Sequence, residues 1–311
     1  MRGKDLLSIA DLNREDISLL LSRAVELKAE GWTRSLSEKV LALVFEKPSL
    51  RTRVSFEVAM RQLGGHAIYL PPAEVGLGER ESAPDVARVL SRYVNAIAAR
   101  TFAHQTLEAL AQFADVPVIN ALSDLEHPCQ ALADLLTIYE KKGELEGLTL
   151  AYVGDGNNVA HSLMLASALA GINFRIASPS GYEVHDDLLR LAQGYAVESG
   201  VEIMCTGDPR QAVYDADIIY TDVWTSMGQE SESEKRREAF AGYQITGELL
   251  MLAEEDAILM HPLPAHHGEE VAGGILEGPQ SVVFDQAENR MHMQKALLAD
   301  MLGGLEFPLM K

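Results

Sequence analysis

The sequence predicts an α/β protein of two domains, each a mostly parallel sheet flanked by helices. Short, nearly continuous apolar runs such as Val40–Phe45 are typical of strands buried on both faces of a parallel sheet. In both halves of the chain such runs pass through a polar turn into a helical pattern, which is the plan of an α/β unit. A length of 311 residues suits two domains of ordinary size.

Composition disfavours several classes of protein. A net charge of −20 argues against nucleic acid or an anionic membrane as a partner. No apolar stretch approaches a membrane span or a secretory signal, so we expect a cytoplasmic location. Two cysteines, Cys129 and Cys205, and nine histidines without HExxH-type spacing predict neither a disulfide framework nor a metal site.

The first chemically informative stretch follows an amphipathic opening helix at about 11–30. Strand 40–45 ends before Pro48, and Ser49 is a candidate N-cap for a helix that closes near residues 64–65. Backbone N–H groups at a helix start favour an anion, and Arg51 and Arg53 lie in the same first turn. Each arginine hydrogen bond contributes roughly 1.5–3 kcal/mol, against about 0.3–1 from the helix dipole. The stretch predicts a phosphate site; a helix start with two solvated arginines is the alternative.

Arg100 is the next candidate. It follows strand 96–99, after a short strand at 66–70, an exposed loop at 71–84 and a helix near 86–93. Ligands of parallel α/β sheets bind outside the carboxyl ends of the strands. Arg100 could therefore face the same crevice as Arg51, with a surface ion pair as the alternative.

A histidine and an amide then stand together at a helix start. Strand 116–120 precedes a helix in which Pro128 suits the first position, so that His127 lies at the helix start with Gln130 and Asp134 on its face. Such a pair can donate to a carbonyl oxygen and accept from an amide nitrogen, although simple capping is the alternative. We expect Cys129 to be a packed apolar thiol.

The second half repeats the plan, with strand 148–153, the turn GDGNNV and a helix at 160–169. The turn matches a dinucleotide fingerprint only in part, because Val159 occupies the third glycine position. Strand 174–177 ends in Ser178 rather than in an acidic residue that would hold a ribose. A nicotinamide-dependent oxidoreductase is therefore disfavoured, and Asn157 and Asn158 remain as polar contacts.

Two later strands, 218–221 and 257–260, also end in polar loops, DVWTSMG at 222–228 and HPLPAHHG at 261–268. Between them the segment 229–243 is highly charged, and we expect it to be solvated or mobile. Near the end, Val282-Val283-Phe284 precedes DQAENR, and we expect a helix from about Asn289 to Leu302 with Arg290 in its first turn.

Together these segments resemble the aspartate/ornithine carbamoyltransferase family, most closely its ornithine branch, over essentially the whole chain. The resemblance implies carbamoyl transfer from carbamoyl phosphate to L-ornithine, giving L-citrulline and phosphate, without a cofactor, in arginine biosynthesis or in the reverse direction. It implies a carbamoyl-phosphate-binding domain at 1–138, an ornithine-binding domain at 139–288, and a C-terminal helix at 289–311 that packs back on the first. The active site is expected in the interdomain cleft of a homotrimer or a multiple of trimers.

The resemblance also assigns site residues. For carbamoyl phosphate they are Ser49, Leu50, Arg51, Thr52, Arg53, Arg100, His127, Pro128, Cys129, Gln130, Pro262, Leu263 and Arg290. The catalytic groups among them are expected to be Arg51, Thr52, Arg100, His127 and Gln130. Ornithine is assigned to Asn158, Asp222, Ser226 and Met227.

Three positions depart from the family pattern. Leu50 replaces the usual threonine of the phosphate turn, Pro262 replaces the cysteine of an HCLP loop, and Gly76 stands where a neighbouring subunit often supplies a glutamine or histidine. Two alternatives remain open: a carbamoyltransferase for putrescine, N-acetylornithine or aspartate, and a non-catalytic paralogue that binds carbamoyl phosphate.

Overall fold

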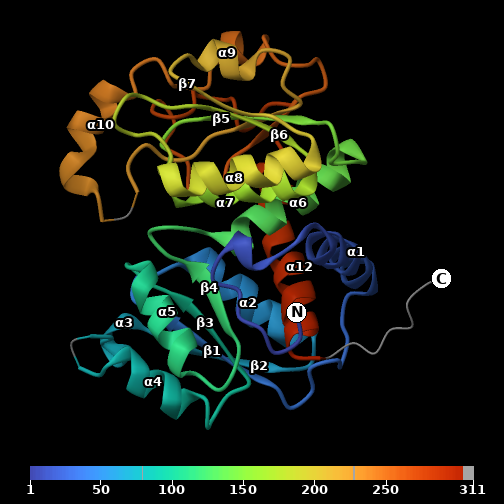
Figure 1. Ribbon diagram of the computed structural model, residues 1–311, viewed down its shortest axis with the longest axis vertical. Coiled ribbons are helices and arrows are strands. Elements are labelled where there is room, and N and C mark those ends of the chain that lie inside the picture. The colour runs from blue at the N-terminus through green and yellow to red at the C-terminus, as the bar shows by residue number, and fades with distance from the viewer. Residues whose placement is uncertain (79, 227, 304–311) are drawn as a thin grey trace. The chain divides into compact units, whose positions relative to one another are not determined.

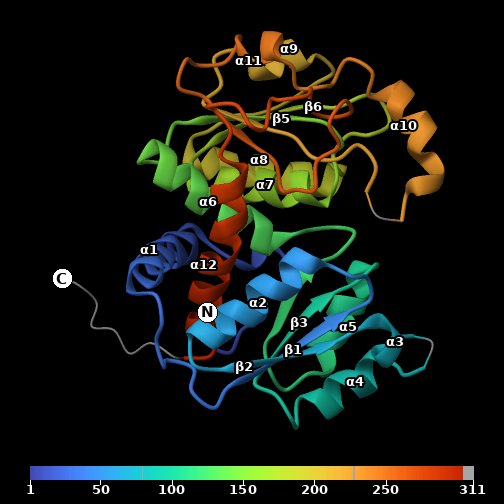
Figure 2. The ribbon, with the colours of Figure 1, turned by 180° about the vertical axis from the view of Figure 1, so that it is seen from behind.

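The computed structural model describes residues 1–78, 80–226 and 228–303 (Figures 1 and 2). Contacts divide the chain into two compact units, residues 1–133 with the described chain from Arg290 on, and residues 134–289. The divisions fall inside two helices, α6 (Pro128–Lys142) and α12 (Val283–Met301), which also contain the expected domain boundaries at 138 and 288. Each unit is built on a parallel sheet, as predicted.

The first unit has four parallel strands in the order β2-β1-β3-β4. Their bounds are β1 Val40–Phe45, β2 His66–Leu70, β3 Ala96–Arg100 and β4 Val118–Leu122. The helices are η1 (Ile9–Asp11), α1 (Arg14–Glu30), α2 (Leu50–Gln62), α3 (Pro72–Val75), α4 (Ala83–Leu90) and α5 (His104–Phe113). Alternate residues of β1, Ala42 and Val44, pack with α4 and α5 on one face, while α2 lies on the opposite face (Figures 1 and 2). The apolar side chains of β1 thus pack into a core on each face of the sheet.

The second unit has five parallel strands in the order β7-β6-β5-β8-β9. Their bounds are β5 Thr149–Val153, β6 Asn173–Ala177, β7 Ile203–Thr206, β8 Ile218–Tyr220 and β9 Ile258–Met260. Further helices are α7 (Asn158–Ala170), α8 (Asp186–Ser199), α9 (Pro209–Val213), η2 (Glu230–Glu232), α10 (Ser233–Ala239) and α11 (Gly247–Leu250). Helices α7 and α8 cover one face of the sheet, and α9 lies on the other (Figure 1). Nearly every residue of α7 is buried. None of the described helices is both long and apolar enough to cross a lipid bilayer.

Both sheets have a point at which the strand order reverses. In the first unit β1 lies between β2 and β3, and in the second β5 lies between β6 and β8. Crevices outside the carboxyl ends of the strands at such points are the usual ligand sites of α/β sheets. In the first unit Phe45 of β1 is in register with Arg100 of β3, and in the second Tyr152 of β5 is in register with Tyr220 of β8. The predicted site residues follow these strand ends.

The C-terminal part of α12 completes the first unit. Buried Lys295 donates to the carbonyls of Leu27 at 2.9 Å and Gly31 at 2.7 Å, which lie at the end of α1. Asp300, one helical turn further on, pairs with Arg23 of α1 at 2.8 Å. A lysine that reaches the last carbonyls of a helix satisfies groups that have no partner within that helix.

One predicted helix start was wrong. Helix α12 begins at Val283 rather than near Asn289, because Gln286 is drawn into the core: its amide accepts from the His261 backbone and donates to Asp134, both at 2.8 Å. Most described residues of the charged segment at 229–243 are exposed, as expected, but Phe240 is fully buried and Arg236 is only 6% exposed. Smaller shifts affect β4, which starts two residues later than expected, and α4, which starts at Ala83.

Candidate active site

The candidate site of the first unit is the turn between β1 and α2. Ser49 caps α2 as predicted: its Oγ accepts from the Thr52 backbone at 3.4 Å and donates to Thr52 Oγ1 at 3.0 Å. Arg290 of α12 donates to the same Thr52 Oγ1 at 2.7 Å. Since a hydroxyl oxygen accepts at most two hydrogen bonds, the Thr52 hydroxyl keeps its own proton for a further acceptor.

Basic side chains of the first unit gather around this turn. Burial, followed by the charges of Arg290 and Arg51, lowers the pKa of Arg100 to about 10. Burial and then Arg100 lower the pKa of Lys47 to about 8, although Asp124 and Glu46 oppose the shift. Burial also lowers the pKa of Arg51. Cations that lower one another's pKa values are stabilised by an anion, and four of them suit a doubly charged phosphate.

His127 lies among these cations as a neutral ring. It is buried at the start of α6, and burial, together with the charges of Arg290, Arg100 and Lys47, holds its pKa well below the ordinary value. A neutral imidazole can donate one hydrogen bond to a carbonyl oxygen without adding a further charge. Gln130 is fully buried one turn into α6, and its backbone N–H donates to the His127 carbonyl at 3.0 Å.

Cys129 and Pro128 occupy the start of the same helix. Burial raises the pKa of the Cys129 thiol to about 12, so the thiolate is not formed at neutral pH. The thiol instead points to the Asn120 carbonyl at 3.5 Å. Cys129 is therefore the packed thiol that was predicted, and it supplies no nucleophile.

Lys47 was not singled out from the sequence, and Arg53 has contacts that the sequence did not predict. Lys47 was missed, although it stands two residues before the Ser49 cap, because a lysine beside a turn is usually solvated. Arg53 was predicted to face the phosphate, yet its guanidinium donates to Glu57 at 2.9 Å and lies over the Tyr69 ring at 4.0 Å. Leu50 is 77% exposed, so its backbone rather than its side chain is part of the turn.

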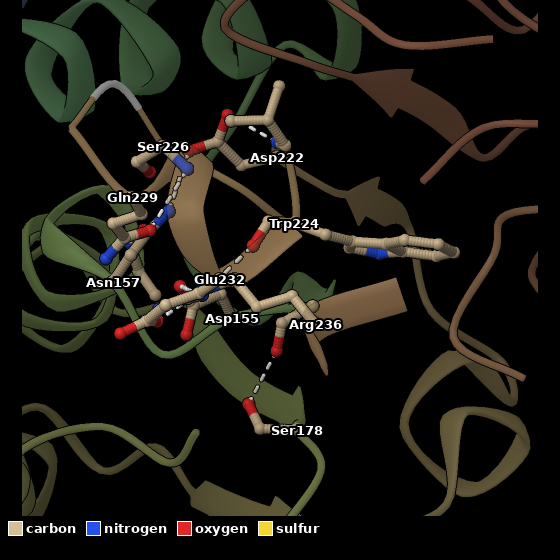
Figure 3. A network of polar contacts seen from close by, with 12 residues as sticks. Asp155, Asn157, Ser178, Asp222, Trp224, Ser226, Gln229, Glu232 and Arg236 are labelled. Carbon is tan, nitrogen blue, oxygen red and sulfur yellow. Dashed lines mark hydrogen bonds and ion pairs between the residues drawn. The ribbon is translucent and has the colours of Figure 1, made fainter. Parts of the chain in front are cut away.

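The second unit has a candidate site of its own at the ends of β5 and β8 (Figure 3). Asn157 caps α7 by accepting from the backbone of Val159 and Ala160, and its amide donates to Asp222 Oδ2 at 2.9 Å. Burial raises the pKa of Asp222, and the hydrogen bond from Asn157 offsets part of that rise. A buried carboxylate of this kind gains from a cationic partner such as an ammonium group.

Arg236 of α10 ties the loop after Asp222 to the end of β5 (Figure 3). Its Nη1 donates to Asp155 Oδ2 at 2.8 Å and to the Trp224 carbonyl at 3.0 Å, and its Nε contacts Glu232 at 3.2 Å. Burial raises the pKa of Asp155 to about 6 even though Arg236 opposes that rise. The sequence pattern could not reveal this pair, because its members are 81 positions apart.

The structure describes fewer contacts for the other residues that were predicted to bind ornithine. Asn158 is the first residue of α7 and is half-buried, and the Ser226 backbone donates to Gln229 at 3.1 Å. Met227 lies outside the described residues. In the first unit, Gly76 ends α3 in the left-handed conformation, with φ of 52°.

Two features bear on cofactors and metals. A Cβ on Gly156 would lie 2.4 Å from the Val184 nitrogen, so this glycine of the GDGNN turn is explained by close backbone packing. His266, Glu269 and Glu270 bring three potential metal ligands within 4.8 Å of one another. Their carboxylates already accept from other groups: Glu269 from Arg237 at 2.9 Å, and Glu270 from the His266 backbone at 2.5 Å.

The comparisons with known proteins also divide the chain into two domains. Residues 4–140 match the carbamoyl-P binding domain of aspartate/ornithine carbamoyltransferase, and residues 146–301 match its Asp/Orn binding domain. The chain belongs to the aspartate/ornithine carbamoyltransferase family.

Relatives within this carbamoyltransferase family are similar over nearly their full length. An ornithine carbamoyltransferase of Anoxybacillus flavithermus is 54% identical over 97% of this chain and 98% of its own. The protein of the same name from Bacillus subtilis is 54% identical over 96% of this chain and 94% of its own. The solved structure of the Pyrococcus furiosus ornithine carbamoyltransferase has a TM-score of 0.94 at 51% identity, covering 98% of this chain and 99% of its own.

Proposed function

We propose that the protein is an ornithine carbamoyltransferase, which transfers the carbamoyl group of carbamoyl phosphate to the side-chain amine of L-ornithine and releases L-citrulline and phosphate. The observation that carries this proposal is the group of four cations around a neutral His127 at the end of β1 and β3. The names of the full-length relatives support the same reaction. Carbamoyl phosphate carries its own leaving group, so a site of cations without a nucleophile suits it.

In the proposed mechanism the first unit holds carbamoyl phosphate. The phosphate is bound by Ser49, the Leu50 backbone, Arg51 and Thr52, with Arg53 and Lys47 adding positive charge. Arg100, His127 and the Thr52 hydroxyl donate to the carbamoyl oxygen, beside Pro128, Cys129 and Arg290. Gln130 and the carbonyls of Pro262 and Leu263 accept from the carbamoyl NH2. Loss of one donor to a developing oxyanion typically lowers the rate by about 10²–10³.

In the proposed second step ornithine is presented as a neutral amine. Asp222 pairs with the α-ammonium group, and Asn158, Ser226 and Met227 hold the rest of the amino-acid end. The amine lone pair attacks the carbamoyl carbon, a C–N bond forms, and the C–O bond to phosphate breaks. The electron pair of that bond leaves with the phosphate, and the proton that the amine loses is taken up by the departing phosphate. Neutral His127 keeps its proton throughout and stabilises the tetrahedral oxyanion.

The residues also favour ornithine over aspartate. Asp222 would repel the second carboxylate of aspartate, whereas it attracts an amino-acid ammonium. N-acetylornithine lacks the α-ammonium charge and would therefore lose the contact with Asp222. Putrescine keeps an ammonium at that end but lacks the carboxylate, so it would lose the contacts of the carboxylate only.

The proposal extends to organisation. We assign carbamoyl phosphate to residues 1–138 and ornithine to residues 139–288, with the helix at 289–311 belonging to the first domain. The two family matches, at 4–140 and 146–301, support a division near residue 140, and the contacts of the chain from Arg290 on support the assignment of the last helix. We also propose a cytoplasmic homotrimer, or a multiple of trimers, in which the loop at 71–84 of a neighbour contributes to each site.

The test is a panel of amines with the purified protein. Carbamoyl phosphate is incubated with ornithine, N-acetylornithine, putrescine or aspartate, and the ureido product and phosphate are both measured. We expect stoichiometric citrulline and phosphate with ornithine, at a kcat/KM at least tenfold above that for each other amine. Product from another amine at a higher kcat/KM would refute the choice of ornithine. Binding of carbamoyl phosphate without any product would indicate the non-catalytic alternative.

A further inference from the structure

Glu270 is a buried carboxylate that the mechanism above does not use. It is fully buried, and its Oε1 lies 3.2 Å from His261 Nε2. The same oxygen accepts from the His266 backbone at 2.5 Å. Glu270 therefore contacts both ends of the segment 261–266, which contains Pro262 and Leu263.

The hydrogen bonds of His261 determine which ring nitrogen carries the proton. The Leu263 backbone N–H donates to His261 Nδ1 at 2.9 Å, so Nδ1 must be the unprotonated acceptor. The ring proton is then on Nε2, where it is donated to Glu270. Desolvation raises the pKa of Glu270, but the hydrogen bonds from His261 and His266 outweigh it and leave that pKa below the ordinary value. The carboxylate is thus ionised at neutral pH and selects the Nε2–H tautomer.

The bond from Leu263 to His261 also sets the direction of a carbonyl. The Leu263 N–H and the Pro262 C=O belong to one trans peptide unit, in which they point in opposite directions. Fixing the N–H on His261 therefore fixes the direction of the Pro262 carbonyl. Leu263 has φ of 54°, a left-handed conformation that costs a residue with a side chain roughly 1–2 kcal/mol. The hydrogen bond to His261 helps to hold the peptide in this orientation.

We propose that Glu270 is a positioning residue that acts through His261 to aim the Pro262 carbonyl at the carbamoyl NH2 group. The catalytic part of this inference rests on the proposed carbamoyl transfer. The contacts from Glu270 to His261, and from His261 to the Leu263 peptide, do not depend on that proposed reaction.

The kinetic test compares Glu270→Gln with its neighbour Glu269→Gln. Glutamine at 270 keeps the size of the side chain but removes the charge that selects the tautomer, and its NH2 can turn toward His261. Glu269 pairs with Arg237 and has no hydrogen bond to His261, so its variant is the matched control. We expect E270Q to lower kcat/KM for carbamoyl phosphate about 10–100-fold, the range seen when a partner that orients a metal-binding histidine is removed. The KM for ornithine should stay within about twofold, because the charge of Glu270 is the smallest of the causes that shift the pKa of Asp222, and E269Q should resemble the parent protein.

A second test examines His261 directly. In protein labelled with ¹⁵N-histidine, we expect an Nε2–H ring for His261 in the parent protein and in E269Q, and a mixture of tautomers in E270Q. If E270Q fails to fold, two variants of His261 replace it: asparagine can place an acceptor near the Nδ1 position, whereas glutamine extends toward the Nε2 position. We expect H261N to keep at least tenfold more activity than H261Q.

Each outcome of these experiments either supports or overturns the proposed role of Glu270. Equal kcat/KM for E270Q and E269Q, or an unaltered Nε2–H tautomer in an impaired E270Q, would overturn the role of Glu270. Equal activity of H261N and H261Q would overturn the role of the Leu263 hydrogen bond. A parent protein that makes no ureido product refutes the proposed function instead, while the tautomer measurement still decides whether Glu270 sets the state of His261.

Discussion

Replacing Arg236 with methionine would leave Asp155 as a buried carboxylate without its cation. The folded protein holds Asp155 at a pKa of about 6, above its ordinary value of 3.8, because burial outweighs the opposing charge of Arg236. The folded state therefore binds this proton more tightly than the unfolded chain does. The stabilisation from protonation is complete below pH 3.8 and is lost as the pH rises through 6. Without Arg236 the pKa of Asp155 should rise further, so the variant should lose more stability than the parent as the pH increases.

The magnitude follows from the contacts that are removed. Breaking one partner of a buried ion pair typically destabilises by about 3–5 kcal/mol, which we expect for R236M at pH 8. At pH 5 Asp155 is largely protonated in both proteins, and what remains is the lost bond to the Trp224 carbonyl with some packing, about 1–2 kcal/mol. Denaturant unfolding at both pH values, at one fixed protein concentration, measures the two differences.

Two further variants make this measurement decisive. Arg237 is the neighbouring arginine of α10 but is exposed and pairs with Glu269, so R237M should change stability by no more than about 0.5–1 kcal/mol at either pH. The double variant D155N/R236M should recover most of the loss seen at pH 8, because no unpaired charge is left in the core. An R236M defect that is equal at pH 5 and pH 8, or one that R237M reproduces, would refute the assigned role of the pair.

Three other changes have expected outcomes. Arg51→Met should abolish detectable turnover while circular dichroism stays unchanged, and near-normal turnover would discredit the phosphate assignment. Lys47→Met should raise the KM for carbamoyl phosphate at least tenfold, from the loss of about 1.5–3 kcal/mol of charge-assisted bonding. In the parent protein, affinity should fall as the pH rises through about 8, where Lys47 loses its proton, and this fall should be absent in K47M. Gly156→Ala should destabilise by about 2–3 kcal/mol in denaturant unfolding, because its methyl group would overlap the Val184 backbone.

Local signals in the sequence predicted the strand-turn-helix units well. The apolar run Val40–Phe45 and the N-cap at Ser49 lie where they were expected, because both depend on contacts within a few residues. Pro128 at the first position of α6 was found for the same reason. These short-range features were enough to bring Arg51, Arg100 and His127 to the ends of neighbouring strands.

Features that depend on distant partners were missed. Arg236 stands in a run of charges and is indistinguishable there from a solvated arginine, yet Asp155 and the Trp224 carbonyl bury it. Strand β7, Ile203–Thr206, escaped notice because it lies at the edge of its sheet and is only partly buried. The last helix was expected only from about Asn289, whereas it begins at Val283. No local sequence pattern predicts the role of Glu270 or that of Lys47.

The contacts of Lys295 with α1 affect the order in which the two units fold during synthesis. During translation α1 emerges early, but Lys295 and Asp300, which hold its last carbonyls and Arg23, are made only after the whole second unit. Domains generally fold as units once their residues are available. We therefore expect the second unit to reach its native state first on the ribosome, and the N-terminal segment to wait as a partly folded intermediate until the last helix arrives.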